Sequence, residues 1–343
     1  MKKGLLLSGI IVWTLIVLVL LTLIAFIIGR GNNTIVSNTA TASLVKQETV
    51  SLTDIENFVV KTSSTTIEIV KTNGTEARIS QYGSVGNASE QEFTLDRNGG
   101  TVEVNIPPNH QLFTISVSRS RLVVELPAQY TKNLDATTSS GNIRVKDSFT
   151  LQDVSLDCSS GNIHIERELA ADSLTMHTSS GRMVVNDSLR VKGEIRLKGS
   201  SGSVKMDGPV QAHSLVVKIS SGTITLGKTL TETFDLESNS GTIRVSGITG
   251  RGSAESSSGN VYVTLDSPFQ DVELRTNSGS IHITVDASAS FKFTGLCSSG
   301  NIRANFPLEK NDKGNRATGS VGGNPTALIS ARSGSGNIVI NQG

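Results

Sequence analysis

The sequence predicts an all-β protein, a single-stranded parallel β-solenoid of about thirteen coils with about 20 residues each. Two observations predict it. The dipeptide Ser-Gly recurs at nearly constant spacing, and apolar residues alternate with polar ones on both sides of it. Glycine is frequent, at 33 of 343 residues, and aromatic residues make up only 4%. Long amphipathic helices are disfavoured because glycine and β-branched residues recur throughout the repeats.

The repeat is centred on nine glycines, which we call the corner glycines, each preceded by serine and spaced 18 to 21 residues apart. They are Gly141, Gly161, Gly181, Gly202, Gly222, Gly241, Gly259, Gly279 and Gly300. Two residues after each lies an aliphatic residue or methionine: Ile143, Ile163, Met183, Val204, Ile224, Ile243, Val261, Ile281 and Ile302. A second apolar position follows two residues later. This alternation predicts a strand with one buried face.

A second alternating segment precedes each corner glycine, and a short apolar pair such as Phe149 and Leu151 follows the second strand as a third side. A unit this small cannot bury its apolar face alone, so equivalent units are expected to stack in parallel around a shared core. Weaker repeats extend the stack in both directions, with corner residues at Thr65, Gly100, Ser120 and Gly336. Glycine at the corner is expected to supply a positive φ.

The N-terminus predicts a membrane anchor at residues 1–30. An uncharged, mostly apolar run from Leu5 to Ile28 would span about 36 Å as a helix, enough for a bilayer core of about 30 Å. A cleaved signal peptide is the alternative, but its apolar core is shorter and ends in small residues. Lys2 and Lys3 precede the run and only Arg30 follows closely. We therefore expect a single-pass protein with a cytoplasmic N-terminus and an extracytoplasmic body.

The remaining chain is expected to divide into two parts. Residues 31–50 are rich in Asn, Ser and Thr without a period, and predict a flexible linker. Residues 51–343 predict the solenoid. Its repeat is irregular at 70–92, and 307–326 predicts a loop excursion. One use for this excursion is to cover the open end of the stack, since exposed strand edges promote aggregation.

Composition excludes several kinds of function. With 31 Lys+Arg against 30 Asp+Glu, the chain lacks the basic excess of a dedicated nucleic-acid binder. The histidines include His164 and His282 in equivalent positions, but about six coils apart, too far to share a metal. Cys158 and Cys297 are also equivalent and about seven coils apart, so they predict small inward packing and no disulfide. No catalytic residue, metal or cofactor is predicted, and the protein is not expected to be an enzyme.

Four cations share one outward position, three residues after the corner glycine. They are Arg144, Lys205, Arg244 and Arg303, and no acid occupies this position in the nine coils. We call these four residues the basic strip. It is a candidate binding surface for anionic cell-wall polymers, lipid head groups or other envelope proteins. The alternative is an ordinary solvated strand face whose long side chains prevent aggregation.

The Ser-Ser-Gly-Asn-Ile-x-Val unit, found in close variants at 139–145, 159–165 and 298–304, carries a resemblance to a known family. Behind a single anchor, it resembles the bacterial candidate-adhesin β-strand-repeat proteins, a domain family without known biochemical activity. Some members look like membrane-anchored components of Lia-type cell-envelope stress systems. The resemblance covers roughly residues 50–343 and implies no catalytic residues.

Three functions stay open on the sequence. The first is a non-catalytic, membrane-anchored module at the cell surface, for adhesion or for sensing envelope stress. The second is a structural scaffold that assembles end to end. The third is a carbohydrate-active β-helix enzyme, which would need clustered acids beside a cleft and long loops projecting from one side.

Overall fold

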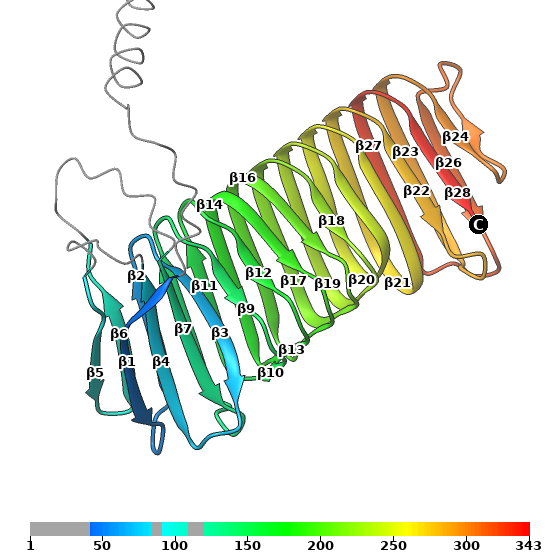
Figure 1. Cartoon of the computed structure of the whole chain (residues 1–343). Helices are drawn as coiled ribbons and strands as arrows, with labels where there is room; N and C mark the ends of the chain where they lie inside the picture. Colours follow the sequence, from blue (N-terminus) through cyan, green and yellow to red (C-terminus); the bar gives the residue numbers. More distant parts are fainter. Residues whose placement is uncertain (1–41, 84–90, 109–119) are drawn as a thin grey trace, which may run out of the picture. The chain divides into compact units, whose positions relative to one another are not determined.

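The structure is a computed structural model that describes residues 42–83, 91–108 and 120–343 (Figure 1). Every regular element in these residues is a β-strand, and the strands hydrogen-bond into one 28-stranded sheet. The expected anchor at 1–30 and most of the expected linker lie outside the described residues. Within the described part, no helix has the length and apolar character needed to cross a bilayer.

The strands follow one another closely along the chain. The first part forms β1 (Ser43–Ser51), β2 (Asn57–Thr62), β3 (Thr66–Thr72), β4 (Glu76–Gly83), β5 (Thr94–Asn98), β6 (Thr101–Ile106) and β7 (Arg121–Pro127). The middle forms β8 (Asn133–Thr138), β9 (Ile143–Val145), β10 (Phe149–Thr150), β11 (Asp153–Cys158), β12 (Ile163–Ile165), β13 (Leu169–Ala171), β14 (Ser173–Val185), β15 (Leu189–Val191), β16 (Glu194–Met206), β17 (Val210–Ser221), β18 (Ile224–Leu226), β19 (Thr229–Ser240), β20 (Ile243–Ser258), β21 (Val261–Ser278) and β22 (Ile281–Val285). The last part forms β23 (Phe291–Ser299), β24 (Ile302–Ala304), β25 (Glu309–Lys310), β26 (Arg316–Val321), β27 (Ala327–Ser335) and β28 (Ile338–Gln342).

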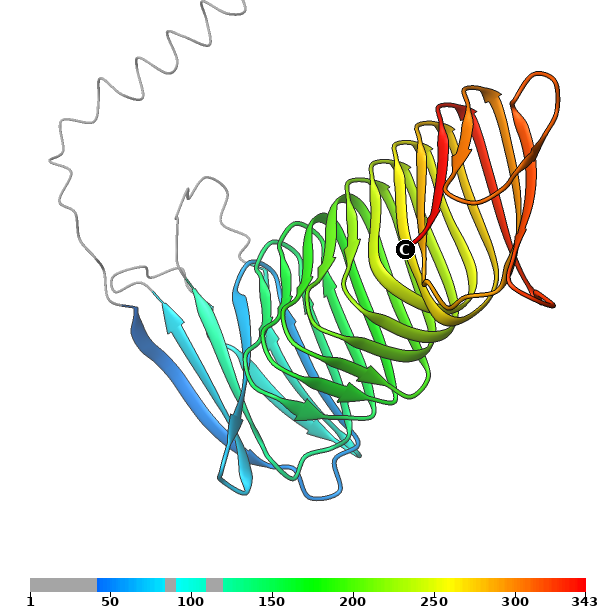
Figure 2. The same cartoon turned by 90° about the vertical axis from the view of Figure 1, so that its right-hand side faces the viewer.

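The middle of the chain is a parallel β-solenoid whose coils have three sides. In one coil these sides are β11, β12 and β13. Each side pairs in parallel with the same side of the next coil, through Leu156 and Met176, Ile163 and Met183, and Leu169 and Leu189. Figure 2 shows the stacked coils from the side. Each predicted repeat of about 20 residues therefore corresponds to one coil of the stack.

The core lies inside the coils, where the alternation places it. The nine apolar residues two positions after the corner glycines are all at most 1% exposed. The second apolar position is also buried, from Val145 to Ile283, and only Ala304 in the coil of β24 is partly exposed. Equivalent side chains thus form continuous columns through one hydrophobic cluster.

The corner glycines are required by close approach between coils. A β-carbon on Gly161 would collide with the carbonyl oxygen of Gly141, and one on Gly181 with that of Gly161. The same relation continues through Gly279. Among the nine, only Gly202, Gly222 and Gly300 have positive φ, at 136–139°. The expected reason for glycine was therefore wrong at most corners: contact with the carbonyl below, and not the backbone dihedral, excludes larger residues.

Small polar side chains three residues before the corner glycines complete each corner. Thr178 donates a hydrogen bond to the carbonyl oxygen of Gly161 (3.2 Å), and Ser256 to that of Gly241 (2.8 Å). Cys158 takes the same role through its sulfur, which lies 3.1 Å from the carbonyl oxygen of Gly141. Burial raises the pKa of the Cys158 thiol. Both cysteines are free and buried, in agreement with the prediction of inward packing.

The first coils are not stacked in chain order. β2 pairs in parallel with β6 on one side and with β8 on the other, while β3 lies between β7 and β9. Strands β5 and β6 form an antiparallel hairpin in which Asn98 faces Thr101. Gly100 is therefore in a hairpin turn and is not a solenoid corner. β6 and β7 are two sides of one coil, so this region holds one coil fewer than the sequence predicts.

The last coils are exchanged in the same way. β27 pairs in parallel with both β21 and β23, and β28 pairs with both β22 and β24. The coil formed by β27 and β28, which we call the inserted coil, therefore lies between two coils that precede it in the chain. Its Gly336 stacks on Gly279, and Gly300 stacks on Gly336. In Figure 1 the red strand β27 accordingly lies beside yellow β21.

The excursion at 307–326 contains two antiparallel strands that cover one edge of the last coil. β26 pairs antiparallel with β23, and β25 pairs with β26. Phe306 packs edge-on against Phe291 and Phe293, with ring centroids 5.6 and 6.5 Å apart. The excursion thus caps the apolar end of the first side, as a solenoid end requires.

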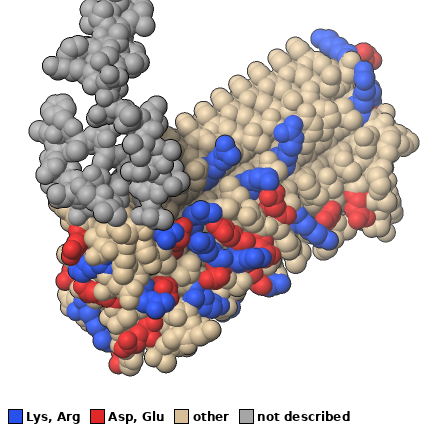
Figure 3. Space-filling view, in the orientation of Figure 1, with Lys and Arg blue, Asp and Glu red and all other residues tan. Residues whose placement is uncertain are grey.

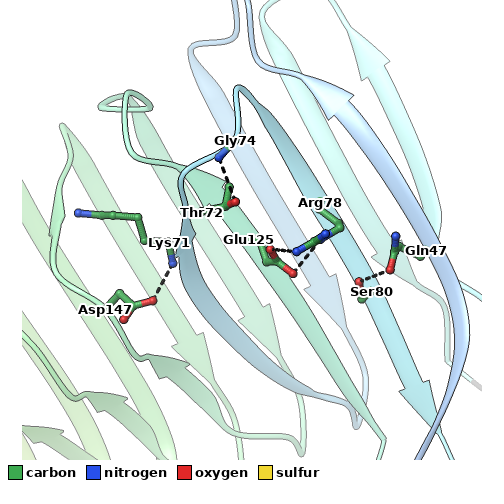
Figure 4. A network of polar contacts seen from close by, with 8 residues as sticks. All are labelled: Gln47, Lys71, Thr72, Gly74, Arg78, Ser80, Glu125 and Asp147. Carbon is green, nitrogen blue, oxygen red and sulfur yellow. Dashed lines mark hydrogen bonds and ion pairs between the residues drawn. The ribbon is translucent and has the colours of Figure 1, made fainter.

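The opposite end is extended by an antiparallel sheet. β4 pairs antiparallel with β7, and β1 with β4, so residues 43–50 form a strand and are not part of a flexible linker. Figure 4 shows polar contacts on this sheet and on the neighbouring coil. Arg78 donates to Glu125 from Nε (2.9 Å), and Ser80 to Gln47 (3.3 Å). The irregular interval at 70–92 contains β4, which turns the stack from parallel to antiparallel pairing.

Candidate functional site

The basic strip lies on one outward face, on the second side of the coils. Arg144 is on β9, Lys205 on β16, Arg244 on β20 and Arg303 on β24. Parallel register fixes their order along the stack. The coil exchange changes the predicted neighbours, because Glu68 pairs with Arg144 and Val339 pairs with Arg303. Val339 therefore lies between Arg303 and the rest of the strip, and Glu68 lies beside Arg144 at the other end of the strip.

Two of the four cations have a carboxylate partner, which lies on the next coil for Arg144 and two residues further along the chain for Lys205. Arg144 lies 2.8 Å from Glu166, and Lys205 lies 2.6 Å from Asp207. These pairs are half-exposed, so each contributes at most about 1 kcal/mol to stability, but they reduce the positive potential of the strip. Figure 3 shows Lys and Arg side chains interspersed with Asp and Glu over the first part of the stack. The face is thus only mildly basic.

Arg244 belongs to a stacked group on three neighbouring coils. Its guanidinium lies 5.0 Å from the ring centroid of Tyr262, and Tyr262 stacks on His282 with centroids 4.7 Å apart and an angle of 15°. This arrangement orients the guanidinium by a cation–π contact, and no carboxylate among the described residues forms an ion pair with it. The Nδ1 atom of His282 is buried and has no hydrogen-bond partner among the described residues.

The described part of the chain contains a His–Asp pair but no cluster of candidate metal ligands. No group of three or more His, Cys, Asp or Glu side chains lies close enough there to hold a metal ion. His177 lies 3.0 Å from Asp157 on the neighbouring coil, a pair that the register of β11 and β14 explains. A cross-strand pair of this kind stabilises stacking between coils.

A groove on the third side of the coils was not found from the sequence. Two cavities of about 540 and 440 Å³ lie there and share His213, Leu230, Thr231 and Glu232, so they form one continuous depression. The sequence shows the third side only as short apolar pairs. The outward residues between these pairs follow no pattern, so no signal marked them as a site.

The model of the Toastrack DUF4097 family matches residues 55–192 and 168–341. No curated protein matches the chain in sequence. Among solved structures, a candidate adhesin from Bacteroides fragilis aligns over 88% of this chain and 98% of its own, with 11% identity and a TM-score of 0.39. A candidate adhesin from Parabacteroides merdae aligns over 86% and 95%, with 14% identity and a TM-score of 0.42.

A crystal structure described as a candidate lipid-binding protein, from Parabacteroides distasonis, aligns over 85% of this chain and 96% of its own, with 14% identity and a TM-score of 0.41. The two matches of the family model overlap at 168–192 and together cover almost all of the described stack. The chain therefore belongs to the Toastrack DUF4097 family.

Proposed function

We propose that the protein is a non-catalytic, membrane-anchored module whose solenoid lies outside the cytoplasmic membrane and binds envelope components, for adhesion or for sensing envelope stress. The apolar run from Leu5 to Ile28, with Lys2 and Lys3 before it, supports the anchor and the orientation. Membership of the Toastrack family, with its β-solenoid-like fold, agrees with a surface module.

The observation that carries the proposal is the fixed register of the outward columns. Parallel pairing holds Arg144, Lys205 and Arg244 on one long face, at multiples of about 4.8 Å. A repeating polyanion can contact such a row at several points, so weak contacts add up. The ligand chemistry is phosphate or carboxylate, from a cell-wall polymer or from lipid head groups.

Charge reversal of the basic strip tests this proposal. Replacing Arg144, Lys205, Arg244 and Arg303 with Glu in the full chain should weaken retention on anionic material at least about tenfold, since each basic residue near such a surface contributes about 1 kcal/mol. Retention is measured on vesicles containing phosphatidylglycerol and, separately, on isolated anionic wall polymer. The arm that responds identifies the source of the anion.

A matched control reverses four exposed cations elsewhere, at Lys61, Lys198, Lys228 and Arg332, and gives the same change in net charge. This variant should retain most of the binding. Equal loss of retention in both variants would mean that net charge alone causes the effect, and the strip would not be a binding site. Unchanged retention in the strip variant would also contradict the strip as a binding site.

End-to-end assembly is the alternative. The antiparallel strands at both ends of the stack weigh against it, because β26 on β23 and β5 on β6 occupy edges that another solenoid would need. Light scattering of the full chain in detergent, at rising protein concentration, would reveal polymers if this alternative were correct.

A further inference from the structure

The third side of the coils carries a groove that runs along the stack axis. Its lining comes from consecutive coils, from Thr150 at one end to Gln270 at the other. In Figure 1 the third side lies along the lower edge of the stack, where β10 and β13 are labelled. A coil adds about 4.8 Å, so the groove crosses about six coil steps, or roughly 29 Å.

The groove has an apolar floor and hydrogen-bonding walls. The floor consists of buried residues of modest size, among them Ala171, Val191 and Ala212. One wall contains the outward residues Arg190, Gln211 and Leu230, of which Leu230 is 50% exposed. The opposite wall contains Asp172, Lys192, His213, Glu232 and Arg251. Amide, carboxylate, guanidinium and ammonium groups thus project along both sides of the floor.

The charges of the walls are balanced. Lys192 lies 2.7 Å from Asp172, and His213 lies 3.2 Å from Glu232. Arg190 pairs with Glu168, just outside the groove. A polyanion would meet Asp172 and Glu232, and a polycation would meet the basic residues beside them. The balance therefore favours an occupant without net charge that can donate and accept many hydrogen bonds.

The backbone of the third side is already used. Thr150 pairs with Ala170, Ala170 with Arg190, Arg190 with Gln211, and Gln211 with Leu230, all in parallel register. No open strand edge runs along this row of coils, so an extended peptide cannot bind by strand addition. Recognition depends on side chains alone, which suits a ligand whose own polar groups lie on its surface.

We infer that this groove binds an extended, uncharged glycan along the stack axis. A pyranose unit is close in length to one coil step, so successive sugars can meet equivalent positions on successive coils. Their hydroxyls match the paired charges and amides of the walls, and their C–H faces match the exposed side chain of Leu230. The basic strip lies on another side of the coils, so ligand binding in the groove and ligand binding on the strip can be tested independently.

Binding of neutral oligosaccharides to the full chain in a mild detergent tests the inference. Cello-oligosaccharides and chito-oligosaccharides, from disaccharide to octasaccharide, are titrated by calorimetry. Affinity should rise with chain length until the groove is filled. Two variants act on the groove: Gln211→Ala with Glu232→Ala removes polar contacts, and Ala170→Trp fills the space. Each should weaken binding at least about tenfold, or about 1.4 kcal/mol.

Lys198→Ala provides a control on an exposed position of the first side in the coil of Gln211, and it should leave oligosaccharide binding unchanged. The strip variant should also bind neutral oligosaccharides normally. No binding of either series, or binding that all variants retain, would overturn the inference while leaving the strip experiment valid. Cleaved oligosaccharide, detected by chromatography, would instead contradict the non-catalytic part of the proposed function.

Discussion

Removing residues 327–343 is expected to disorder the last part of the solenoid, and not simply to shorten it by one coil. The inserted coil lies between the coils of β21–β22 and β23–β24. Its buried side chains include Ile329, Ile338 and Ile340, all 0% exposed. Each large aliphatic side chain contributes about 1.5–3 kcal/mol when buried, so the loss amounts to several kcal/mol at one place in the stack.

Hydrogen exchange on the full and truncated chains measures this effect. The truncation removes β27 and β28, which are the parallel strand partners of 291–304. Amides of 291–304 should therefore lose protection from exchange. Coils between 133 and 245 should keep it, because each coil contacts only its neighbours. A strictly sequential stack predicts the opposite, since the last coil would then be outermost. Full protection of 291–304 after truncation would contradict the exchanged order.

Gly181→Ala is expected to lower the free energy of unfolding by about 3 kcal/mol, the upper part of the range for overpacking. The new methyl group would collide with the carbonyl oxygen of Gly161, which is held by the ladder between coils. Backbone cannot move aside there without breaking hydrogen bonds on both sides. Thermal and denaturant unfolding, followed by circular dichroism, would measure the loss.

Gly323→Ala is the matched control, because nothing lies within 4 Å of a β-carbon at that position. It should change stability by less than about 0.5 kcal/mol, as most exposed substitutions do. Similar stability of the two variants would show that the corners have room for a side chain. The close-approach explanation of the Ser-Gly repeat would then be wrong.

The inward columns could be predicted from the sequence because two signals agree. Period-two alternation identifies the buried face of each strand, and the fixed spacing aligns one coil with the next. The side chains after the corner glycines are buried for this reason, from Ile143 to Ile302. The role of the 307–326 excursion as a cap also follows from physical need, since the end of a solenoid exposes strand edges.

The order of the coils could not be predicted, because the same regularity makes coils interchangeable. Ile281 packs on Ile338, but it could pack equally well on Ile302. The repeat pattern does not distinguish these two coil orders. Contacts outside the repeat distinguish the two arrangements: Phe306 packs against Phe291 and Phe293, and β26 pairs with the outer edge of β23. Contacts of this kind involve irregular segments, where pattern analysis has least information.

The candidate sites show the same division. Equivalent positions placed the cations of the basic strip on one face. Their partners at Glu166 and Asp207 needed side-chain geometry, and the neighbour Glu68 needed the exchanged coil order. The groove was missed because its wall residues, such as Arg190 and Gln211, share a position in the coil but no residue type.

Cysteine crosslinking tests the coil order most directly. In a background with Cys158→Thr and Cys297→Ser, Arg275→Cys with Arg332→Cys places two thiols on adjacent strands in register. Their expected Cα separation of about 4.8 Å allows a disulfide. Arg275→Cys with Leu296→Cys places the thiols two strands apart, at about 9.6 Å, beyond the limit of about 7 Å. The exchanged order predicts rapid crosslinking of the first pair alone, and crosslinking of the second pair alone would contradict it.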